Sequence, residues 1–425
     1  MEFERALEEL ESRQPERMVP NLTRIRALAE LMDDPQLTYP TIHVTGTNGK
    51  TSTSRLIGRI LCAHGLFTGV YTSPHLESVT ERLALCDDDI SEDEFGKEYE
   101  RLLPYLHEVD RLGIRVTYFE TLTALAYLWF ADKPVDAAVF EVGMGGTWDA
   151  TNLVRPQVAV FCQVDLDHPE LGSTVEEVAR EKAGIVKEGS TVVIQDPNPA
   201  VLAAVEPRAA ERNAPTLIRD RDWWLRDPQL ALGGWRMTVA TPQTEYADLF
   251  LPLQGYQAEN AATAVVACEA LLGRPLSSDS LREALSGATA PGRMEVLSRR
   301  PLLIGDGAHN PAGARALATS VADTFDRGRV FVVLACSANK DIDGIVQGLA
   351  SLAPALVFAA HNSSSRSAPA ERVAEACATE GLDVKTCSSV EEALSAARDA
   401  AQESDLILVT GSLYTVADAR RAILT

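Results

Sequence analysis

Several features that define whole classes of proteins are missing from this sequence. Its 425 residues contain no run of about 18 apolar residues, so the sequence predicts no membrane-spanning helix. The N-terminal stretch MEFERALEELESRQPER is charged and amphipathic, and we expect no signal or transit peptide. No low-complexity block is present, which argues against disordered and fibrous classes. The sequence therefore predicts a globular protein, which we expect in the cytoplasm.

Paired cysteines and positive charge are also scarce. The seven cysteines are scattered and form no C-x-x-C pair, so we expect no zinc or redox site and reduced, mostly buried thiols. Lys and Arg number 39 against 61 Asp and Glu, a net charge of −22 that argues against nucleic acid and anionic membranes as partners. An anionic ligand would need local positive potential from backbone N–H groups, a few basic side chains and metal ions.

The apolar pattern predicts an α/β fold with two domains. The length favours two domains, and β-branched runs alternate with helical patterns as in parallel sheets built from βαβ units. A turn-forming stretch at residues 289–293 sets the boundary, which gives domains of residues 1–290 and 291–425. The predicted strands are 40–44, 136–142, 157–164, 191–194, 302–305, 329–335, 355–360 and 405–410; the predicted helices are 51–64, 120–131, 173–187, 260–272, 314–324 and 391–401.

The sharpest local motif follows the first of these strands. Gly46-Thr47-Asn48-Gly49-Lys50-Thr51 joins a strand to a helix, so successive backbone N–H groups can point at one phosphate. Lys50 would neutralise the β- and γ-phosphates and the Thr51 hydroxyl would reach Mg²⁺. Val44 stands where a full Walker A motif has its first glycine, and a tight strand-to-helix turn alone would explain the loop equally well.

Further motifs in the same chain order favour the functional interpretation. With the loop they resemble folylpolyglutamate synthase / dihydrofolate synthase of the Mur ligase superfamily over about residues 20–415. The resemblance implies an N-terminal P-loop ATPase-type domain with a parallel sheet and a smaller C-terminal Rossmann-like α/β domain. The motifs are Thr72-Ser73-Pro74-His75-Leu76, Tyr118-Phe119-Glu120, Glu141-Val-Gly-Met-Gly-Gly with Asp149-Ala-Thr-Asn152, Asp167-His168, Arg180-Glu-Lys182, Glu259-Asn260, Pro291-Gly-Arg293 and Asp306-Gly-Ala-His309-Asn310-Pro.

The length before the loop distinguishes branches of this superfamily. Mur enzymes that build peptidoglycan carry a UDP-sugar-binding domain ahead of the phosphate loop. Only 45 residues precede Gly46, so we expect no such domain here.

The resemblance implies an ATP site and two metal sites. Glu141 ends an apolar strand before a glycine turn, where open α/β sheets bind ligands, and with Thr51 and Ser73 it would hold Mg²⁺ through oxygen. His168 and Lys182 match ligands of a second metal, for which Mn²⁺ would also serve. The residues matched to ATP are Gly46, Thr47, Asn48, Gly49, Lys50, Thr51, Asn260, Arg293 and Asp306.

Two of these assignments have clear alternatives. Family members carry the lysine matching Lys182 as a carbamate, which would relieve the repulsion between an ammonium and the metal. An ordinary surface lysine paired with Glu181 or Glu177 is the alternative. A lone His168 is more often a structural hydrogen-bonding residue than a ligand.

The substrate residues also follow from the resemblance. Phe119 would support a pterin ring and Asp149 would accept its N–H groups, although Phe119 and Trp148 could equally be core residues. Arg293, on the turn between the domains, would reach the phosphates when the domains close. The residues matched to the pterin site are Phe119, Glu120, Trp148, Asp149 and Ala150, and those matched to the glutamate site are His309, Lys340 and Ser412.

The implied activity is an ATP-dependent ligation. An acyl phosphate would form on dihydropteroate or on the γ-carboxylate of a reduced folate, and L-glutamate would attack it in a protein that we expect to be a monomer. The alternatives are a Mur-type ligase acting on another carboxylate and a nucleotide-binding regulatory protein. The residues assigned to catalysis are Lys50, Glu141, His168, Lys182 and His309.

Overall fold

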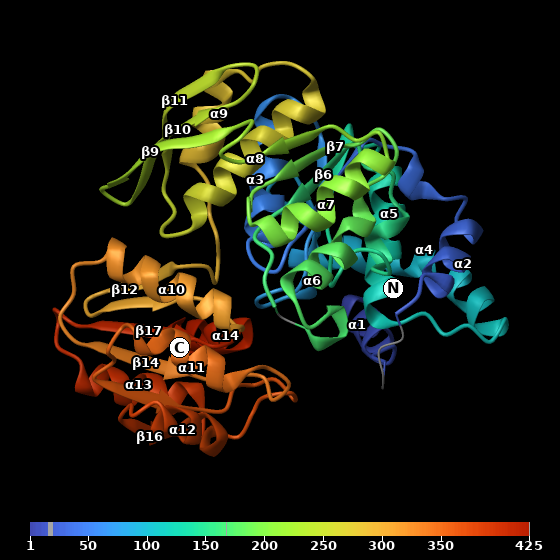
Figure 1. Cartoon of the computed structure of the whole chain (residues 1–425). Coiled ribbons are helices and arrows are strands. Elements are labelled where there is room, and N and C mark those ends of the chain that lie inside the picture. Colours follow the sequence, from blue (N-terminus) through green and yellow to red (C-terminus); the bar gives the residue numbers. More distant parts are fainter. Residues whose placement is uncertain (16–19, 167, 425) are drawn as a thin grey trace. The chain divides into compact units, whose positions relative to one another are not determined.

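The computed structural model describes residues 1–15, 20–166 and 168–424, and the chain divides into two compact units (Figure 1). The first comprises Met1–Pro228, Arg236–Leu251 and Glu259–Ala288, and the second Gln229–Trp235, Pro252–Ala258 and Thr289–Thr425. Two short segments thus belong to the second unit although they precede residue 289 in the sequence.

The first unit is built on an eight-stranded, mostly parallel sheet with the order β4-β3-β2-β5-β1-β6-β7-β8. Only β3 and β4 run antiparallel to their neighbours among these strands. Strand β1 lies between β5 and β6, so its carboxyl end is where connections diverge to either side, the usual ligand position in such sheets. The strands are β1 Thr41–Thr45, β2 Thr68–Tyr71, β3 Leu83–Leu85, β4 Asp88–Asp89, β5 Ala137–Glu141, β6 Val158–Phe161, β7 Thr191–Ile194 and β8 Thr216–Ile218.

Helices cover both faces of this sheet because its central strands are apolar on both sides. Phe140 packs in one core cluster with α4 and α5, and Phe161 in another with α6 and α7. On the other face α3 comes so near to β2 that a Cβ at Gly58 would lie 2.3 Å from Val70. The helices are α1 Phe3–Glu11, α2 Thr23–Leu31, α3 Lys50–Ala63, α4 Glu92–Arg111, α5 Tyr118–Asp132, α6 Val175–Lys182, α7 Pro199–Glu211, α8 Gln257–Leu272 and α9 Ser278–Ser286.

The structure corrects one helix and adds one sheet. The helix predicted to reach residue 187 ends at Lys182, because the next turn is a 3-10 helix whose Gly184 packs directly on Thr147. A three-stranded sheet of order β11-β10-β9, which was not predicted from the sequence, packs on α9 (Figure 1). Its strands are β9 Trp224–Ala231, β10 Gly234–Ala240 and β11 Glu245–Leu251; the 3-10 helices are η1 Pro35–Leu37, η2 Val79–Arg82, η3 Ala150–Leu153, η4 Pro169–Leu171 and η5 Ala183–Ile185.

The second unit is a doubly wound six-stranded sheet of order β12-β13-β17-β14-β15-β16, in which only β12 is antiparallel. One face packs on α10, α11 and α12 and the other on α13 and α14. The predicted fold class is therefore confirmed. The elements are β12 Glu295–Arg299, β13 Leu302–Gly305, β14 Val330–Leu334, β15 Leu356–Ala359, β16 Val384–Thr386, β17 Leu406–Thr410, α10 Pro311–Thr324, α11 Ile342–Ala350, α12 Ala370–Thr379, α13 Val390–Ala400 and α14 Leu413–Leu424.

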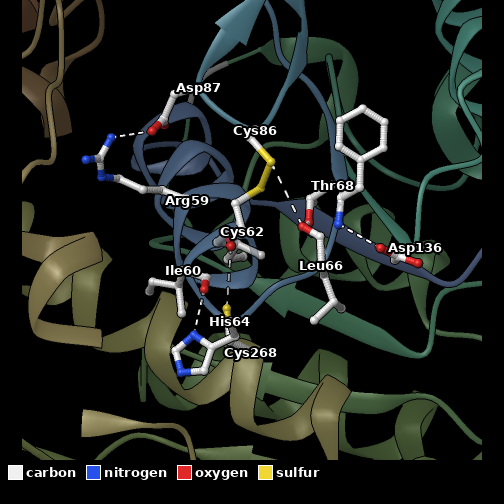
Figure 2. Close-up of a disulfide and its surroundings, with 12 residues drawn as sticks. Arg59, Ile60, Cys62, His64, Leu66, Thr68, Cys86, Asp87, Asp136 and Cys268 are labelled. Atoms are coloured by element: carbon white, nitrogen blue, oxygen red, sulfur yellow. Dashed lines mark hydrogen bonds and ion pairs between the residues drawn. A yellow bond between two sulfur atoms is a disulfide. The ribbon is translucent and has the colours of Figure 1, made fainter. Parts of the chain in front are cut away.

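The expectation that all cysteines are reduced is wrong for two of them. Figure 2 shows a disulfide between Cys62 in the last turn of α3 and Cys86 in the turn between β3 and β4. The other five cysteines are buried free thiols. The pair meets because the chain returns from α3 through β2 to a hairpin that lies beside the end of that helix. Disulfides are typical of oxidising compartments, so a cytoplasmic location stays a prediction.

Within the described part of the chain, no helix is both long and apolar enough to cross a membrane.

Candidate functional site

The phosphate loop joins the end of β1 to the start of α3, as its sequence predicts. Gly49 caps α3 with a left-handed φ of 87°, and a Cβ there would lie 2.6 Å from Oδ1 of Asn260 on α8. The Lys50 side chain folds back over the loop, and its Nζ donates to the carbonyls of Gly46 at 3.0 Å and Thr47 at 3.3 Å. Asn260, a predicted nucleotide residue, therefore contacts the loop itself.

The loop is also held by the segment that follows β6. The N–H of Thr47 donates to the carbonyl of Gln163 at 2.7 Å, and the Thr47 hydroxyl donates to the carbonyl of Asp165 at 2.7 Å. The Asn48 amide donates to the side chain of Gln163 at 3.2 Å. The sequence analysis missed Gln163 and Asp165, because their contribution is made largely through backbone carbonyls that no residue type reveals.

Three residues predicted to bind the first metal meet beside this loop. Glu141, at the end of β5, is 1 % exposed and accepts from the Thr51 hydroxyl at 2.8 Å on Oε1 and from the backbone N–H of Ser73 at 2.9 Å on Oε2. A carboxylate and two hydroxyl-bearing residues form the hard oxygen set that Mg²⁺ prefers. These residues therefore fit the ion that the sequence predicts.

Lys182 lies next to the same loop from the end of α6. It is 3 % exposed, and its Nζ donates to the carbonyl of Gly46 at 2.9 Å. The alternative of an ordinary surface lysine is therefore wrong. His168 precedes η4 and is half-buried, with its carbonyl accepting from Leu171 at 3.0 Å. Asp167 of the same motif lies outside the described residues.

A glycine turn after Glu141 brings the metal and acceptor residues together. A Cβ at Gly143 would lie 2.5 Å from the Phe119 ring, and a Cβ at Gly146 would lie 2.6 Å from the carbonyl of Lys182. These glycines thus let an aromatic side chain and the end of α6 pack directly on the turn. The Glu181 carboxylate accepts from the N–H of Thr147 at 2.9 Å, and burial raises the pKa of Glu181.

Other residues predicted for the pterin site have local partners in the structure. Glu120 caps α5 together with Thr117 and forms an ion pair with Arg24 at 2.9 Å. Ala150 is buried, and its carbonyl accepts from the hydroxyl of Tyr127 at 2.9 Å.

Two more residues of the predicted pterin site directly precede the 3-10 helix η3. Trp148 is half-buried against the core of α6 and α7. Asp149 is 4 % exposed and accepts from the N–H groups of Met144 at 2.9 Å and Thr151 at 3.0 Å, and burial raises its pKa. Its carboxylate thus organises the turn.

A basic pair in the segment after β2 was not found from the sequence. Arg82 is buried, donates from Nε to Nδ1 of His75 at 3.0 Å, and places its guanidinium 5.5 Å from the centre of the Tyr118 ring. Burial and the charge of Arg82 lower the pKa of His75 to about 4, so this imidazole is neutral at pH 7. His75 belongs to a motif quoted from the sequence and Arg82 does not, and a buried Arg–His contact has no signature in residue order.

The remaining predicted residues lie in the second unit. Asp306 is buried and accepts from the hydroxyl of Tyr256 at 2.6 Å and from the N–H groups of Met294 and Ala308, both at 2.8 Å. Burial raises the pKa of Asp306. The Arg293 guanidinium lies beside the backbone of Gly307, where a Cβ would be 3.0 Å from it.

The residues predicted to meet glutamate are placed at turns of this unit. His309 Nδ1 bonds with the carbonyl of Gly307 at 2.9 Å. Ser412 is buried and its hydroxyl accepts from the N–H of Tyr414 at 3.3 Å. The backbone N–H of Lys340 donates to the carbonyl of Ser337 at 3.1 Å. Their role in binding glutamate stays a prediction.

A second metal was predicted at His168 and Lys182. Within residues 1–15, 20–166 and 168–424, no three His, Cys, Asp or Glu side chains cluster so as to hold an ion. The Thr51, Ser73 and Glu141 group is of another kind, with one carboxylate and two hydroxyl residues.

Two family models match the chain. The Mur ligase middle domain matches residues 44–268, and the Mur ligase glutamate ligase domain matches residues 292–413. Together with the phosphate loop on a parallel sheet, these matches define the class. The chain belongs to the Mur ligase family.

Relatives within this family indicate the group of Mur ligases to which the chain is similar. Dihydrofolate synthase/folylpolyglutamate synthase of Mycobacterium tuberculosis is 37 % identical over 97 % of this chain and 92 % of its own length. A solved structure of the M. tuberculosis folylpolyglutamate synthase with ADP has a TM-score of 0.95 at 34 % identity, covering 99 % of this chain and 98 % of that one. Escherichia coli FolC, solved with DHPP and ADP, has a TM-score of 0.89 at 31 % identity and covers 100 % of this chain and 98 % of that one.

The resemblance predicted from the motifs is thus confirmed. The chain is an ATP-dependent amide ligase of the dihydrofolate synthase/folylpolyglutamate synthase group. This result excludes the alternative of a regulatory protein outside the ligases.

Proposed function

We propose that this ligase joins L-glutamate to dihydropteroate, to the γ-carboxylate of reduced folates, or to both. An acceptor carboxylate oxygen attacks the γ-phosphorus of ATP, the bond to the ADP oxygen breaks, and an acyl phosphate forms. The amine of glutamate then attacks the acyl carbon, phosphate leaves, and the amine nitrogen loses its extra proton. The observation that carries the proposal is the contact of Thr51 and Ser73 with Glu141 beside the phosphate loop.

The phosphate loop binds and orients ATP in this proposal. The N–H groups at the start of α3 would face the phosphates, and Lys50 would exchange its carbonyl partners for phosphate oxygens. Asn260, against Gly49, borders the nucleotide. Arg293 and Asp306 of the second unit are assigned to the nucleotide by resemblance. Positioning of this kind accounts for most of the catalysis in phosphoryl transfer, because little covalent chemistry falls to the protein.

Thr51, Ser73 and Glu141 would hold Mg²⁺, which when bound offsets negative charge on the phosphates. His168 and Lys182 are assigned to a second ion, Mg²⁺ or Mn²⁺, with Lys182 as a carbamate. A carbamate keeps one N–H, which can still donate to the carbonyl of Gly46. These ions and loop N–H groups provide the positive potential that a chain of net charge −22 needs.

The acceptor and glutamate are assigned to opposite ends of the reacting group. Phe119, Trp148, Asp149 and the turn after Glu141 form the proposed floor for the pterin. His309, Lys340 and Ser412 are assigned to glutamate, whose carboxylates would pair with the lysine and with hydroxyl or imidazole donors. We expect the enzyme to act as a cytoplasmic monomer.

Product analysis tests the proposal. Purified protein is incubated with ATP, Mg²⁺ and L-glutamate together with dihydropteroate, tetrahydrofolate or an unrelated carboxylate such as a UDP-muramoyl peptide. Mass spectrometry should find one added glutamate on dihydropteroate, one or more on tetrahydrofolate, or both, with ADP formed in equal amount. Products only from the unrelated carboxylate would overturn the folate assignment and leave a Mur-type ligase of another substrate.

A further inference from the structure

His43 is a buried histidine in the middle of β1, three residues before the phosphate loop. It is 0 % exposed, and its Nε2 lies 2.8 Å from the hydroxyl oxygen of Thr151, itself 0 % exposed. The Thr151 hydroxyl in turn donates to Oδ1 of Asp149 at 2.5 Å. A continuous line of three side chains therefore connects the loop-bearing strand with η3, which begins just after Asp149.

The protons and lone pairs of these three side chains determine which group donates in each hydrogen bond. A threonine hydroxyl has one proton, and here it is directed at Asp149, so Thr151 must accept from His43. His43 thus carries its proton on Nε2. Its Nδ1 has no partner among the described residues, which is tolerable for a bare lone pair but costly for a buried N–H donor. Burial and the charge of Lys187 lower the pKa of His43 to about 3, in agreement with a neutral ring.

The far end of the line is the turn after Glu141. Oδ1 of Asp149 takes two donors from Thr151, its hydroxyl at 2.5 Å and its N–H at 3.0 Å, while Oδ2 takes the N–H of Met144 at 2.9 Å. Met144 lies between Gly143, which supports the Phe119 ring, and Gly145. A rotation of the Asp149 carboxylate would therefore release the turn on which Phe119 rests and which directly follows Glu141.

We propose that His43 and Thr151 are positioning residues, which hold the Asp149 carboxylate and through it the 143–146 turn in the shape that the pterin-type acceptor requires. The assignment rests on the proposed function of this surface as the acceptor floor. Oδ1 is fully engaged by Thr151, so a ligand donor is left with Oδ2 only. The line thereby also decides which oxygen of Asp149 faces the acceptor.

Matched substitutions separate this role from a merely structural one. Thr151→Val keeps the shape and removes the hydroxyl, whereas Thr151→Ser keeps the hydroxyl. His43→Asn places its amide near the position of Nδ1, whereas His43→Gln can return an N–H donor to the position of Nε2. We expect the KM for dihydropteroate to rise at least tenfold in Thr151→Val and His43→Asn, with the KM for ATP and for glutamate within twofold of wild type. Thr151→Ser and His43→Gln should restore the KM to within about threefold.

Two further measurements do not depend on turnover. Calorimetric titration of dihydropteroate into the protein with bound ADP should show the same loss and rescue of affinity. Ring ¹⁵N spectra of histidine-labelled protein should show a wild-type His43 resonance protonated at Nε2 that shifts in Thr151→Val.

The outcomes distinguish a positioning role from a structural role, and both from a failure of the proposed function. Equal KM and affinity for dihydropteroate in Thr151→Val and Thr151→Ser would overturn the positioning role, as would a proton on Nδ1. A similar rise in the KM values for dihydropteroate, ATP and glutamate, together with a lowered melting temperature, would show that the three side chains have a structural role only. Failure of the wild-type protein to bind or use any pterin acceptor would instead refute the proposed function.

Discussion

The residues predicted for phosphate and metal in the first unit and those predicted for glutamate in the second unit are held by different kinds of contact. At the end of β1 in the first unit, contacts join elements far apart in sequence: Thr51 to Glu141 over 90 residues, and Lys182 to Gly46 over 136. At the corresponding turns of the second unit, His309 bonds with Gly307 and Ser412 with Tyr414, each two residues away.

The two sets of residues differ in which hydrogen bonds fix their side chains. In the first unit the residues meant for phosphate and metal already bond with one another, so their geometry is set by the fold. In the second unit, His309 and Ser412 each form a hydrogen bond within their own turn. We therefore expect substitutions of the phosphate and metal residues to affect the chemical step, and substitutions of the glutamate residues to affect the KM for glutamate.

The largest expected effect comes from comparing one lysine of each unit. Lys50→Ala removes the cation that bridges two loop carbonyls and should lower kcat/KM for ATP by about 10³-fold, about 4 kcal/mol of transition-state stabilisation. Lys340→Ala should instead raise the KM for glutamate about tenfold. Steady-state kinetics with each substrate varied measures both. Near-normal turnover by Lys50→Ala, or equal losses for all substrates in both variants, would break the comparison.

Lys182 sharpens the comparison, because its hydrogen bond to Gly46 joins residues 136 positions apart. If it carries a carbamate, Lys182→Ala should lose more than about 100-fold in activity and recover part of it in added acetate, which can fill the vacated space. Lys182→Arg should remain inactive, with or without acetate, because a guanidinium forms no carbamate. Full activity in Lys182→Arg would refute the carbamate, and mass spectrometry of the native protein offers an independent check.

The disulfide is a third long-range tie of the first unit, from α3 to the hairpin after β3. Arg59 pairs with Asp87 next to it, so the hairpin keeps one link when the disulfide is reduced (Figure 2). Reduction frees a loop with a sequence separation of 24 residues and should cost the first unit ~3 kcal/mol of unfolding free energy. Calorimetry with and without dithiothreitol should show one transition moving to lower temperature.

The control for this measurement is the Cys62→Ala/Cys86→Ala double variant. It should melt like the reduced protein and ignore dithiothreitol, because the five remaining cysteines are buried free thiols. A wild-type melting temperature that is insensitive to reductant would mean that the two thiols are not joined in solution.

The smallest effect is a pH dependence confined to the first unit. Burial and the charge of Lys187 lower the pKa of His43 in the folded protein to about 3 from the ordinary value of 6.5, so between these pH values the unfolded chain binds a proton that the folded one does not. The resulting stability is present above pH 6.5 and is lost as the pH falls toward 3. Between pH 7 and pH 5 this loss is ~1–2 kcal/mol.

Urea unfolding at the two pH values tests this sign. His43→Gln, which cannot titrate, should lose less stability than wild type on acidification, while His75 contributes in the same direction in both proteins. Among the described residues of the second unit, His309 and His361 are not buried, so its transition should lack this term. An equal pH slope in wild type and variant would show that His43 is not a buried neutral group.

Much of the fold could be predicted from residue order. Apolar strands followed by glycine turns and helical patterns placed β1, β5, β6, β7, β13, β14, β15 and β17 within a few residues, because burial on both faces forces continuous apolar runs. The edge strands β12 and β16 were not predicted, and the sheet of β9, β10 and β11 was missed because β9 is largely exposed, so no such run marks it.

The sequence by itself determined the phosphate loop, its family and the identity of Glu141 as a strand-end carboxylate, because these depend on residues adjacent in the chain. Only the tertiary structure decided that Lys182 is buried on Gly46, that Cys62 meets Cys86, and that His43, Thr151 and Asp149 form one hydrogen-bonded line. Each of these depends on which strands and helices become neighbours. That choice is made by packing of the whole sheet, which no local pattern contains.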